Sequence, residues 1–289
     1  MGAALRTLAL FLVLTGLFMV IGWVVGSYFI GDWLLGTLIF ISIAVAINVF
    51  SYFMSDRMVL WSYKAKIAQP SEAPKLYKAL QNVCLKANMP MPRMAIVNIP
   101  TPNAFATGRN QKNAVVAATT GILDILSDDE LEGVLAHEMA HIKDKDILVM
   151  TIAATIAGAI SIAARMLWFG GAGRGQRDGN AMVLILVAIT VPIAALLIRL
   201  AISRSREYKA DYEGAMLIQR PRSLANALAK LEVGNKRRPI RSGNPASASL
   251  FIVNPFSGES IVSILSTHPP IKQRIRKLEE LAQKEGYLR

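Results

Sequence analysis

The sequence contains one cysteine and only three histidines among 289 residues. A single cysteine excludes an intrachain disulfide, which agrees with a reducing compartment such as the cytoplasm. Cys84 lies beside Leu80 and Val83 in a helical pattern, so we interpret it as a buried structural thiol rather than a nucleophile. The chain also has no internal repeat and no low-complexity tract.

Charged residues are absent from two long stretches, between Thr7 and Gly31 and between Trp33 and Met54. This absence argues against a soluble helix pair, since soluble helices carry a polar face. Each stretch exceeds the ~20 apolar residues that cross a bilayer, and only Asp32 separates them. We therefore predict a membrane hairpin over residues 1–54. Its first helix is longer than the apolar region of a signal peptide, so we expect it to be retained.

Two further uncharged runs, Ile147–Ala164 and Ala181–Ile198, have 18 residues each. That length is near the lower limit for crossing a bilayer. We predict that residues 147–198 form a second membrane-spanning hairpin, which gives about four transmembrane helices. The alternative is a hairpin that dips into the membrane or lies against the other helices.

The basic residues predict both the orientation of the chain and a surface partner. Lysine or arginine precedes the first run and follows the second and fourth runs, whereas the turn of the first hairpin has neither. The positive-inside rule therefore places the N-terminus and the polar segments in the cytoplasm. Residues 199–289 hold 17 basic and 8 acidic side chains, which predicts attraction to the lipid bilayer through anionic headgroups. Nucleic acid is the alternative partner, but no aromatic-rich basic motif is present, so we predict no nucleic-acid binding.

The cytoplasmic part is predicted to consist of residues 55–146 and 199–289, separated by the second hairpin. Apolar periodicity predicts a helix over 74–87, strands over 94–99 and 114–123 with the polar stretch 108–113 as a turn, and a final helix from residue 271 that ends at Gly286. Ser127 and Glu130 form a capping-box pattern that begins another helix. These elements predict an α+β fold that is mainly helical, with a small β-sheet joined to the membrane helices.

The helix that follows Ser127 carries His137, Glu138 and His141 in the pattern HExxH. Spacing of i, i+4 places both imidazoles on one helical face, where they can bind one zinc ion. Glu138 is adjacent and can act as a general base towards a water molecule. We therefore predict a zinc metalloendopeptidase with one Zn²⁺ per chain.

A third protein ligand must come from elsewhere, because zinc hydrolases use three protein ligands and a water. His268 is one candidate. Glu207 and Asp211 are another pair to consider, since they lie four residues apart and hence on one helical face. Glu207 can bind the zinc while Asp211 accepts the free N–H of a liganding histidine. Such pairs are also common on solvated helix faces, so the spacing leaves both interpretations open.

Several motifs together resemble the HtpX-type membrane zinc metalloproteases, which are relatives of the CAAX prenyl proteases. The resemblance is carried by PNAFATG at 102–108, LAHEMAHIKDKD at 135–146, SRSREYKADYEGA at 203–215, LFIVNP at 250–255 and STHPPIKQRI at 266–275. It implies a gluzincin-like zincin domain in which the site residues are the zinc ligands His137, His141 and Glu207, the catalytic base Glu138, and Asp211 as the partner of His137. It also implies a multi-pass protein of the bacterial cytoplasmic (inner) membrane that takes part in stress response and quality control.

His268 and the candidate edge-strand segments each allow two interpretations. His268 can stabilise an oxyanion, or it can pack or cap ahead of Pro269-Pro270 at the start of the final helix, which is the interpretation we favour. Residues Asn103 to Gly108, including Ala104 and Phe105, and residues Asn113 to Thr119 are candidates for an edge strand that pairs with extended substrate. The alternative for PNAFATG is a glycine-containing turn, and the resemblance favours the edge strand.

Other functions fit parts of the sequence. An intramembrane protease would carry HExxH inside a spanning helix, whereas here SDDELEG precedes the motif and KDKD follows it. A CAAX-prenyl-protease-like peptidase would have more apolar runs, and a non-catalytic zinc-binding membrane scaffold would need no HExxH. We therefore expect cleavage of membrane proteins or unfolded polypeptides, and the sequence predicts no oligomeric state.

Overall fold

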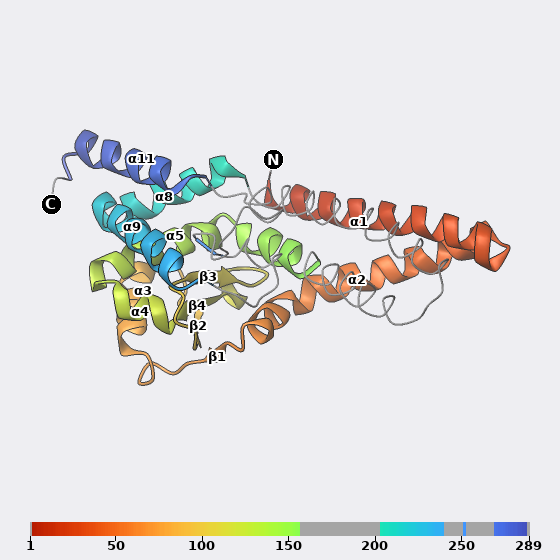
Figure 1. Ribbon diagram of the computed structural model, residues 1–289, viewed down its shortest axis with the longest axis horizontal. Helices are drawn as coiled ribbons and strands as arrows, with labels where there is room; N and C mark the ends of the chain where they lie inside the picture. The colour runs from red at the N-terminus through yellow and green to blue at the C-terminus, as the bar shows by residue number, and fades with distance from the viewer. Residues whose placement is uncertain (1, 157–202, 240–250, 253–268, 288–289) are drawn as a thin grey trace.

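The computed structural model describes residues 2–156, 203–239, 251–252 and 269–287. Two long apolar helices begin the chain, α1 (Ala3–Val25) and α2 (Trp33–Ser62), joined by a π-helical turn at Gly26–Ile30. They lie side by side and project from the rest of the protein (Figure 1). Both are long and apolar enough to cross a membrane. The first predicted hairpin is therefore confirmed as an apolar helix pair, and α2 continues beyond the predicted boundary at residue 54.

The second predicted hairpin is only partly described. Its beginning is a shorter apolar helix, Asp146–Ile156. The rest of residues 147–198 lies outside the described residues. The number of membrane crossings therefore stays a prediction.

Glycines let the two long helices approach closely. A Cβ atom added to Gly22 would lie 2.7 Å from the Gly36 carbonyl oxygen, and one added to Gly26 would lie 2.9 Å from the Cα atom of Trp33. Further along the pair, the Asn48 Nδ2 atom donates a hydrogen bond of 3.1 Å to Thr15 Oγ1. Small residues and an interhelical hydrogen bond are the usual means of holding helices together in lipid, where apolar side chains supply no hydrophobic driving force.

The described residues that follow α2 contain a four-stranded sheet with the order β1-β2-β4-β3. Its strands are β1 (Lys66–Ile67), β2 (Arg93–Val97), β3 (Ala104–Thr107) and β4 (Val115–Thr119). β2 and β4 are parallel, and the outer strands β1 and β3 pair antiparallel with their neighbours. The β3–β4 connection contains a short 3₁₀ turn, Gln111–Asn113.

The strand predicted over 114–123 is too long. It ends at Thr119, whose side chain accepts a hydrogen bond from the Ile122 N–H and thereby begins helix α4 (Thr120–Ile125). The prediction of Asn113 to Thr119 as an edge strand is also wrong, because β4 is paired on both sides. The other candidate, Asn103 to Gly108, contains β3, which lies at an edge of the sheet.

Both faces of the sheet are buried, which explains its continuous apolar strands. Met94, Ala104 and Val116 face a core formed with helices α3 (Pro74–Ala87) and α5 (Asp128–Lys143) and with the C-terminal helices α8 (Arg204–Ile218), α9 (Pro221–Arg237) and α11 (Ile271–Lys284). The opposite face packs against Val59 and Leu60 of α2 and against Ala154. The end of α2 is thus part of the core that covers this face of the sheet.

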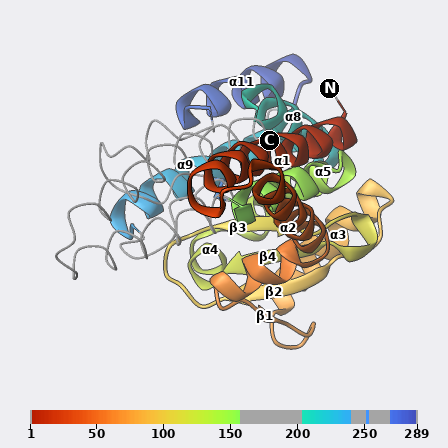
Figure 2. The ribbon, with the colours of Figure 1, turned by 90° about the vertical axis from the view of Figure 1, so that its right-hand side faces the viewer.

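The helices above the sheet are layered. Figures 1 and 2 show α5 next to the sheet, then α8, then α11 outermost. These bounds confirm the predicted helices over 74–87 and from residue 271, and Gly286 follows the end of α11 with a φ of 71°. Within the described residues the fold is mainly helical with a small sheet, as predicted.

The close approach of α1 and α2 predicts that Gly36→Ala destabilises the protein by about 1–3 kcal/mol, because the added methyl group forces the backbones apart. Gly16→Ala is the matched control, since a Cβ atom there has nothing within 4 Å. The control should be neutral or slightly stabilising, because alanine favours helix. Thermal unfolding of both variants in lipid nanodiscs measures the difference, and equal midpoints would contradict the packing described.

Candidate metal centre

Helix α5 places the HExxH residues. The Ser127 side chain accepts from the Glu130 N–H, and the Glu130 carboxylate accepts from the Ser127 N–H, which confirms the predicted capping box. From Glu130 to Ile142 every residue of the helix is buried between the sheet and α8. His137 and His141 therefore project from a helix that is held on all sides.

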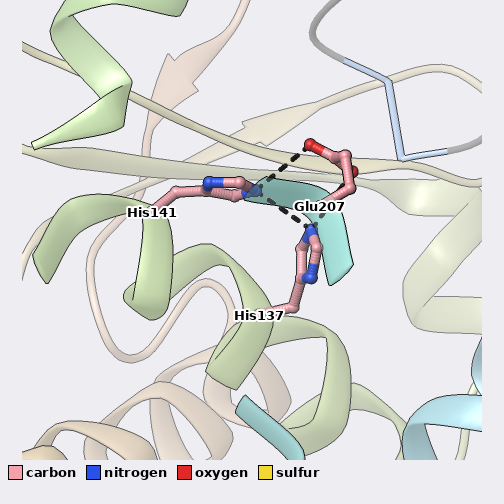
Figure 3. Close-up of side chains that lie close together, drawn as sticks. All are labelled: His137, His141 and Glu207. Carbon is pink, nitrogen blue, oxygen red and sulfur yellow. Dashed lines mark hydrogen bonds and ion pairs between the residues drawn. The ribbon is translucent and has the colours of Figure 1, made fainter. Parts of the chain in front are cut away.

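Three side chains converge from two helices, as Figure 3 shows. The Nε2 atoms of His137 and His141 lie 3.2 Å apart. The Glu207 carboxylate of α8 lies 3.8 Å from His137 Nε2 and 3.5 Å from His141 Nε2. All three residues are buried: His137 is 2% exposed, His141 4% and Glu207 1%. Among the described residues they form a group whose ligand atoms all lie within 4.8 Å of one another.

The geometry of these atoms fits a metal ion. Two nitrogen ligands at 2.0–2.1 Å from a tetrahedral zinc ion lie about 3.3 Å apart, close to the separation of the two Nε2 atoms. The His137 Nδ1 atom lies 3.0 Å from Asp211 Oδ1, and its Nε2 atom faces His141. Two buried imidazole nitrogens and a carboxylate that converge in this way suit a divalent cation.

Asp211 and Glu207 are both held by one buried arginine. Arg274 of α11 has no exposed surface, and it donates two hydrogen bonds to Asp211, of 2.6 and 2.7 Å. Its Nη1 atom donates a hydrogen bond of 3.1 Å to the Ile252 carbonyl oxygen and lies 3.6 Å from Glu207 Oε2. Arg274 thus connects the C-terminal helix to the carboxylate beside His137 Nδ1 and to the carboxylate beside both imidazoles.

The charges around the centre shift its pKa values. Burial raises the pKa of Asp211, but Arg274 and His137 lower it by more, to about 2. The stabilisation from this ionised carboxylate is present above its ordinary pKa and is lost as the pH falls through about 2. Burial lowers the pKa of His141, but Glu207 raises it by more, so the net direction is upward. A proton therefore competes with a metal for this histidine.

Glu138 lies beside the converging residues and is bound to the sheet edge. Its Oε2 atom accepts a hydrogen bond of 2.8 Å from the Ala106 N–H of β3. Glu138 is 6% exposed, and burial raises its pKa more than the neighbouring histidines lower it. The carboxylate is thus held at the junction of helix α5 and the edge strand.

The predicted substrate-strand residues have different surroundings. The Asn103 backbone pairs with Thr119, and its Oδ1 atom accepts from the Ile252 N–H. Ala104 and Phe105 are buried in β3, and Gly108 ends that strand with a φ of 133°, where a Cβ atom would meet the Asn113 carbonyl. The segment is therefore both an edge strand and a glycine turn. His268 lies outside the described residues, so its role stays a prediction.

Two charged residues at the centre were not predicted. Arg274 is one of several cations in a helix whose other face is solvated, but it occupies the apolar stripe with Ile271, Ile275 and Leu278. A charge in that stripe is the signal that could have identified it. The other is Asp146, whose Oδ2 atom lies 3.5 Å from His141 Nδ1. It belongs to the charged stretch KDKD, which the sequence analysis used only to distinguish this helix from the spanning helix of an intramembrane protease.

Comparison with known proteins agrees with this geometry. Residues 70–282 match the sequence profile described as "Peptidase family M48". The chain is 48% identical to "Protease HtpX homolog" of Thermococcus sibiricus, over 99% of this chain and 98% of that protein. It is 47% identical to the protein of the same name from Pyrococcus furiosus, over 99% of both. The crystal structure of Ste24p from S. mikatae is similar in fold, with a TM-score of 0.52 and 16% identity, covering 95% of this chain and 65% of that chain.

The buried pair of Arg274 and Asp211 predicts that Arg274→Met destabilises the protein by about 3–5 kcal/mol, because it leaves a buried carboxylate without a counter-charge. Arg276→Met is the matched control two residues along α11, since the Arg276 side chain is 74% exposed. It should change stability by less than about 0.5 kcal/mol. Unfolding of the metal-free protein in lipid nanodiscs measures both. Similar losses for the two variants would contradict the assigned role of Arg274.

Proposed function

The chain belongs to peptidase family M48, and we propose that it is a membrane-bound zinc endopeptidase that cleaves unfolded polypeptides and the cytoplasmic regions of damaged or misfolded membrane proteins. That it is a protease follows from the family. Two apolar helices and the relatives indicate a membrane protein. The metal, the mechanism and the substrates are parts of the proposal.

The observation that carries the proposal is the convergence of His137, His141 and Glu207 on one point. Two imidazoles and one carboxylate are a ligand set of zinc hydrolases, in which a fourth position stays open. A zinc ion bound there supplies Lewis acidity towards a water molecule and the scissile carbonyl group. The separation of 3.2 Å between the two Nε2 atoms supports tetrahedral coordination.

We assign the proton transfers to Glu138. The hydrogen bond from Ala106 occupies Oε2, which leaves Oε1 as the atom that accepts a proton from the attacking water. The pKa of Glu138 is raised by burial, so the protonated carboxyl can then donate to the leaving amine. Binding to the edge strand also fixes the carboxylate relative to a peptide that lies along that strand.

We propose that substrate binds in extended form along β3. Thr119 N–H donates to the Asn103 carbonyl, and in an antiparallel pair the hydrogen-bonded residues alternate. The N–H and C=O groups of Ala104 and Ala106 therefore point away from β4, and the Ala106 N–H reaches Glu138. Pairing of a peptide with a sheet edge uses backbone groups and tolerates many sequences, which suits unfolded substrates.

The distribution of charge supports a cytoplasmic catalytic site. His141 lies just before the apolar helix Asp146–Ile156, which we propose begins the second membrane hairpin, so the metal centre would lie within a few residues of the membrane. Lysine and arginine flank the apolar runs on the same side. We infer that the N-terminus and the protease domain face the cytoplasm of a bacterial-type inner membrane, and that cuts fall in cytoplasmic loops and tails. The likeness to Ste24p, at 16% identity, is one of fold. It gives no support for a prenyl-protease activity of this chain.

The assignment of the general base predicts that Glu138→Gln abolishes proteolysis of an unfolded substrate, by at least about 10²–10⁴-fold, while one zinc per chain stays bound. Glutamine keeps the shape of the side chain but cannot accept the proton.

Glu132→Gln is the matched control on the same helix. Glu132 is also buried, but it binds Asn82 and Lys86 on the side of α3. The control should keep activity within a few-fold of wild type. Activity assays with zinc analysis test both variants, and an active Glu138→Gln protein would refute the mechanism.

A further inference from the structure

Asp146 lies between the candidate metal centre and the membrane helices. It is the first residue of the apolar helix Asp146–Ile156 and is 2% exposed. Its Oδ2 atom lies 3.5 Å from Nδ1 of His141. That ring nitrogen, like Nδ1 of His137, is buried and makes no hydrogen bond of good geometry among the described residues. A buried polar group without a partner requires an explanation.

The other oxygen of Asp146 faces two arginines from distant parts of the chain. The Arg6 Nη2 atom of α1 lies 3.6 Å from Asp146 Oδ1. Arg206, at the start of α8, forms an ion pair with the same oxygen. The side chains of Arg6 and Arg206 are 15% and 17% exposed, so both ion pairs are largely shielded from water. Charges attract each other more strongly in such a shielded environment than in bulk water.

Apolar contacts hold α1 at this position. Leu10 and Leu14 of α1 are buried against Val149 and Ile152 of the helix that Asp146 begins. Arg6 lies one turn before Leu10 on α1, so the packing of the two helices brings its guanidinium group to the Asp146 carboxylate. The first membrane helix is thereby docked beside the metal centre.

The two histidines have equivalent surroundings. His137 Nδ1 faces Asp211, which is held by Arg274. His141 Nδ1 faces Asp146, which is held by Arg6 and Arg206. In metal sites a carboxylate that accepts the N–H of a liganding imidazole fixes its tautomer and orientation and raises its basicity.

We propose that Asp146 is a positioning residue that orients His141 for metal binding, and that Arg6 of the first membrane helix holds Asp146 in place. The metal affinity of the protease domain then depends on the docking of α1. This inference rests on the proposed metal site and extends it, because it makes the N-terminal membrane helix part of that site rather than only an anchor.

The test measures zinc affinity of the full-length protein in lipid nanodiscs, by competition with a chelator. All variants carry Glu138→Gln so that self-cleavage does not interfere. Asp146→Asn should weaken zinc binding by about 10–100-fold, and Arg6→Gln by a smaller factor of about three to ten. The visible spectrum of the cobalt-substituted protein should change in Asp146→Asn, because the geometry of one imidazole ligand changes.

Asp56→Asn is the matched control, since it removes a carboxylate on α2 that pairs with Arg93 at 3.7 Å, away from the metal centre. It should leave zinc affinity and the cobalt spectrum unchanged. In the Asp146→Asn background, Arg6→Gln should cause no further loss, because its partner carboxylate is gone. A general effect of Arg6 on membrane insertion would persist in that background.

The outcomes separate this inference from the proposed function. Failure of the reference protein to bind zinc would overturn the metal site, and this inference with it. Zinc binding that is unaffected by Asp146→Asn would overturn the positioning role alone. Additive losses from Arg6→Gln and Asp146→Asn, or a loss in Asp56→Asn equal to that in Arg6→Gln, would overturn the link to the membrane helix.

Discussion

Two buried imidazoles whose Nε2 atoms face each other at 3.2 Å set the constraint on which the rest of the site depends. If both Nε2 atoms carry lone pairs, they repel each other unless a cation lies between them. That state requires each Nδ1 atom to hold a proton, and each faces a buried carboxylate. Those carboxylates would in turn be costly to bury without their arginines. The orientation of the two rings therefore depends on Asp211 and Asp146, and these carboxylates depend in turn on cationic side chains of other elements.

These outer partners come from both ends of the chain. Arg274 belongs to the C-terminal helix and Arg6 to the first membrane helix. The sheet is likewise covered on one face by the protease helices and on the other by the end of α2. The end of α2 thus packs on the sheet of the protease domain, and α1 packs on the helix that begins at Asp146. The candidate metal centre lies where segments distant in sequence meet. The proposed position of the site near the bilayer rests on this packing and on the hydropathy of the chain.

The features of the fold and the site that depend on neighbouring residues could be predicted from the sequence. The features that depend on contacts between distant segments could not. The spacing of His137 and His141 needs only a helix, and the capping box at Ser127 needs only four consecutive residues. The separate roles of β3 and β4 could not be read in the same way, because an apolar strand has the same pattern at the centre and at the edge of a sheet whose two faces are buried. Thr119 ends its strand through a side-chain cap that apolar periodicity does not reveal. The burial of Asp146 and Arg274 could not be predicted either, since it depends on segments far away in the sequence.

The central claim is that His137, His141 and Glu207 together bind one zinc ion. X-ray absorption at the zinc edge of the purified full-length protein, loaded with one equivalent of zinc, tests it most directly. The account predicts a first coordination shell of nitrogen and oxygen only, at about 2.0–2.1 Å, with the outer-shell scattering of two imidazole rings. Replacing either histidine with alanine should remove one of those rings. A sulfur ligand at about 2.3 Å, a single imidazole in the wild-type protein, or a spectrum unchanged by both substitutions would contradict the account.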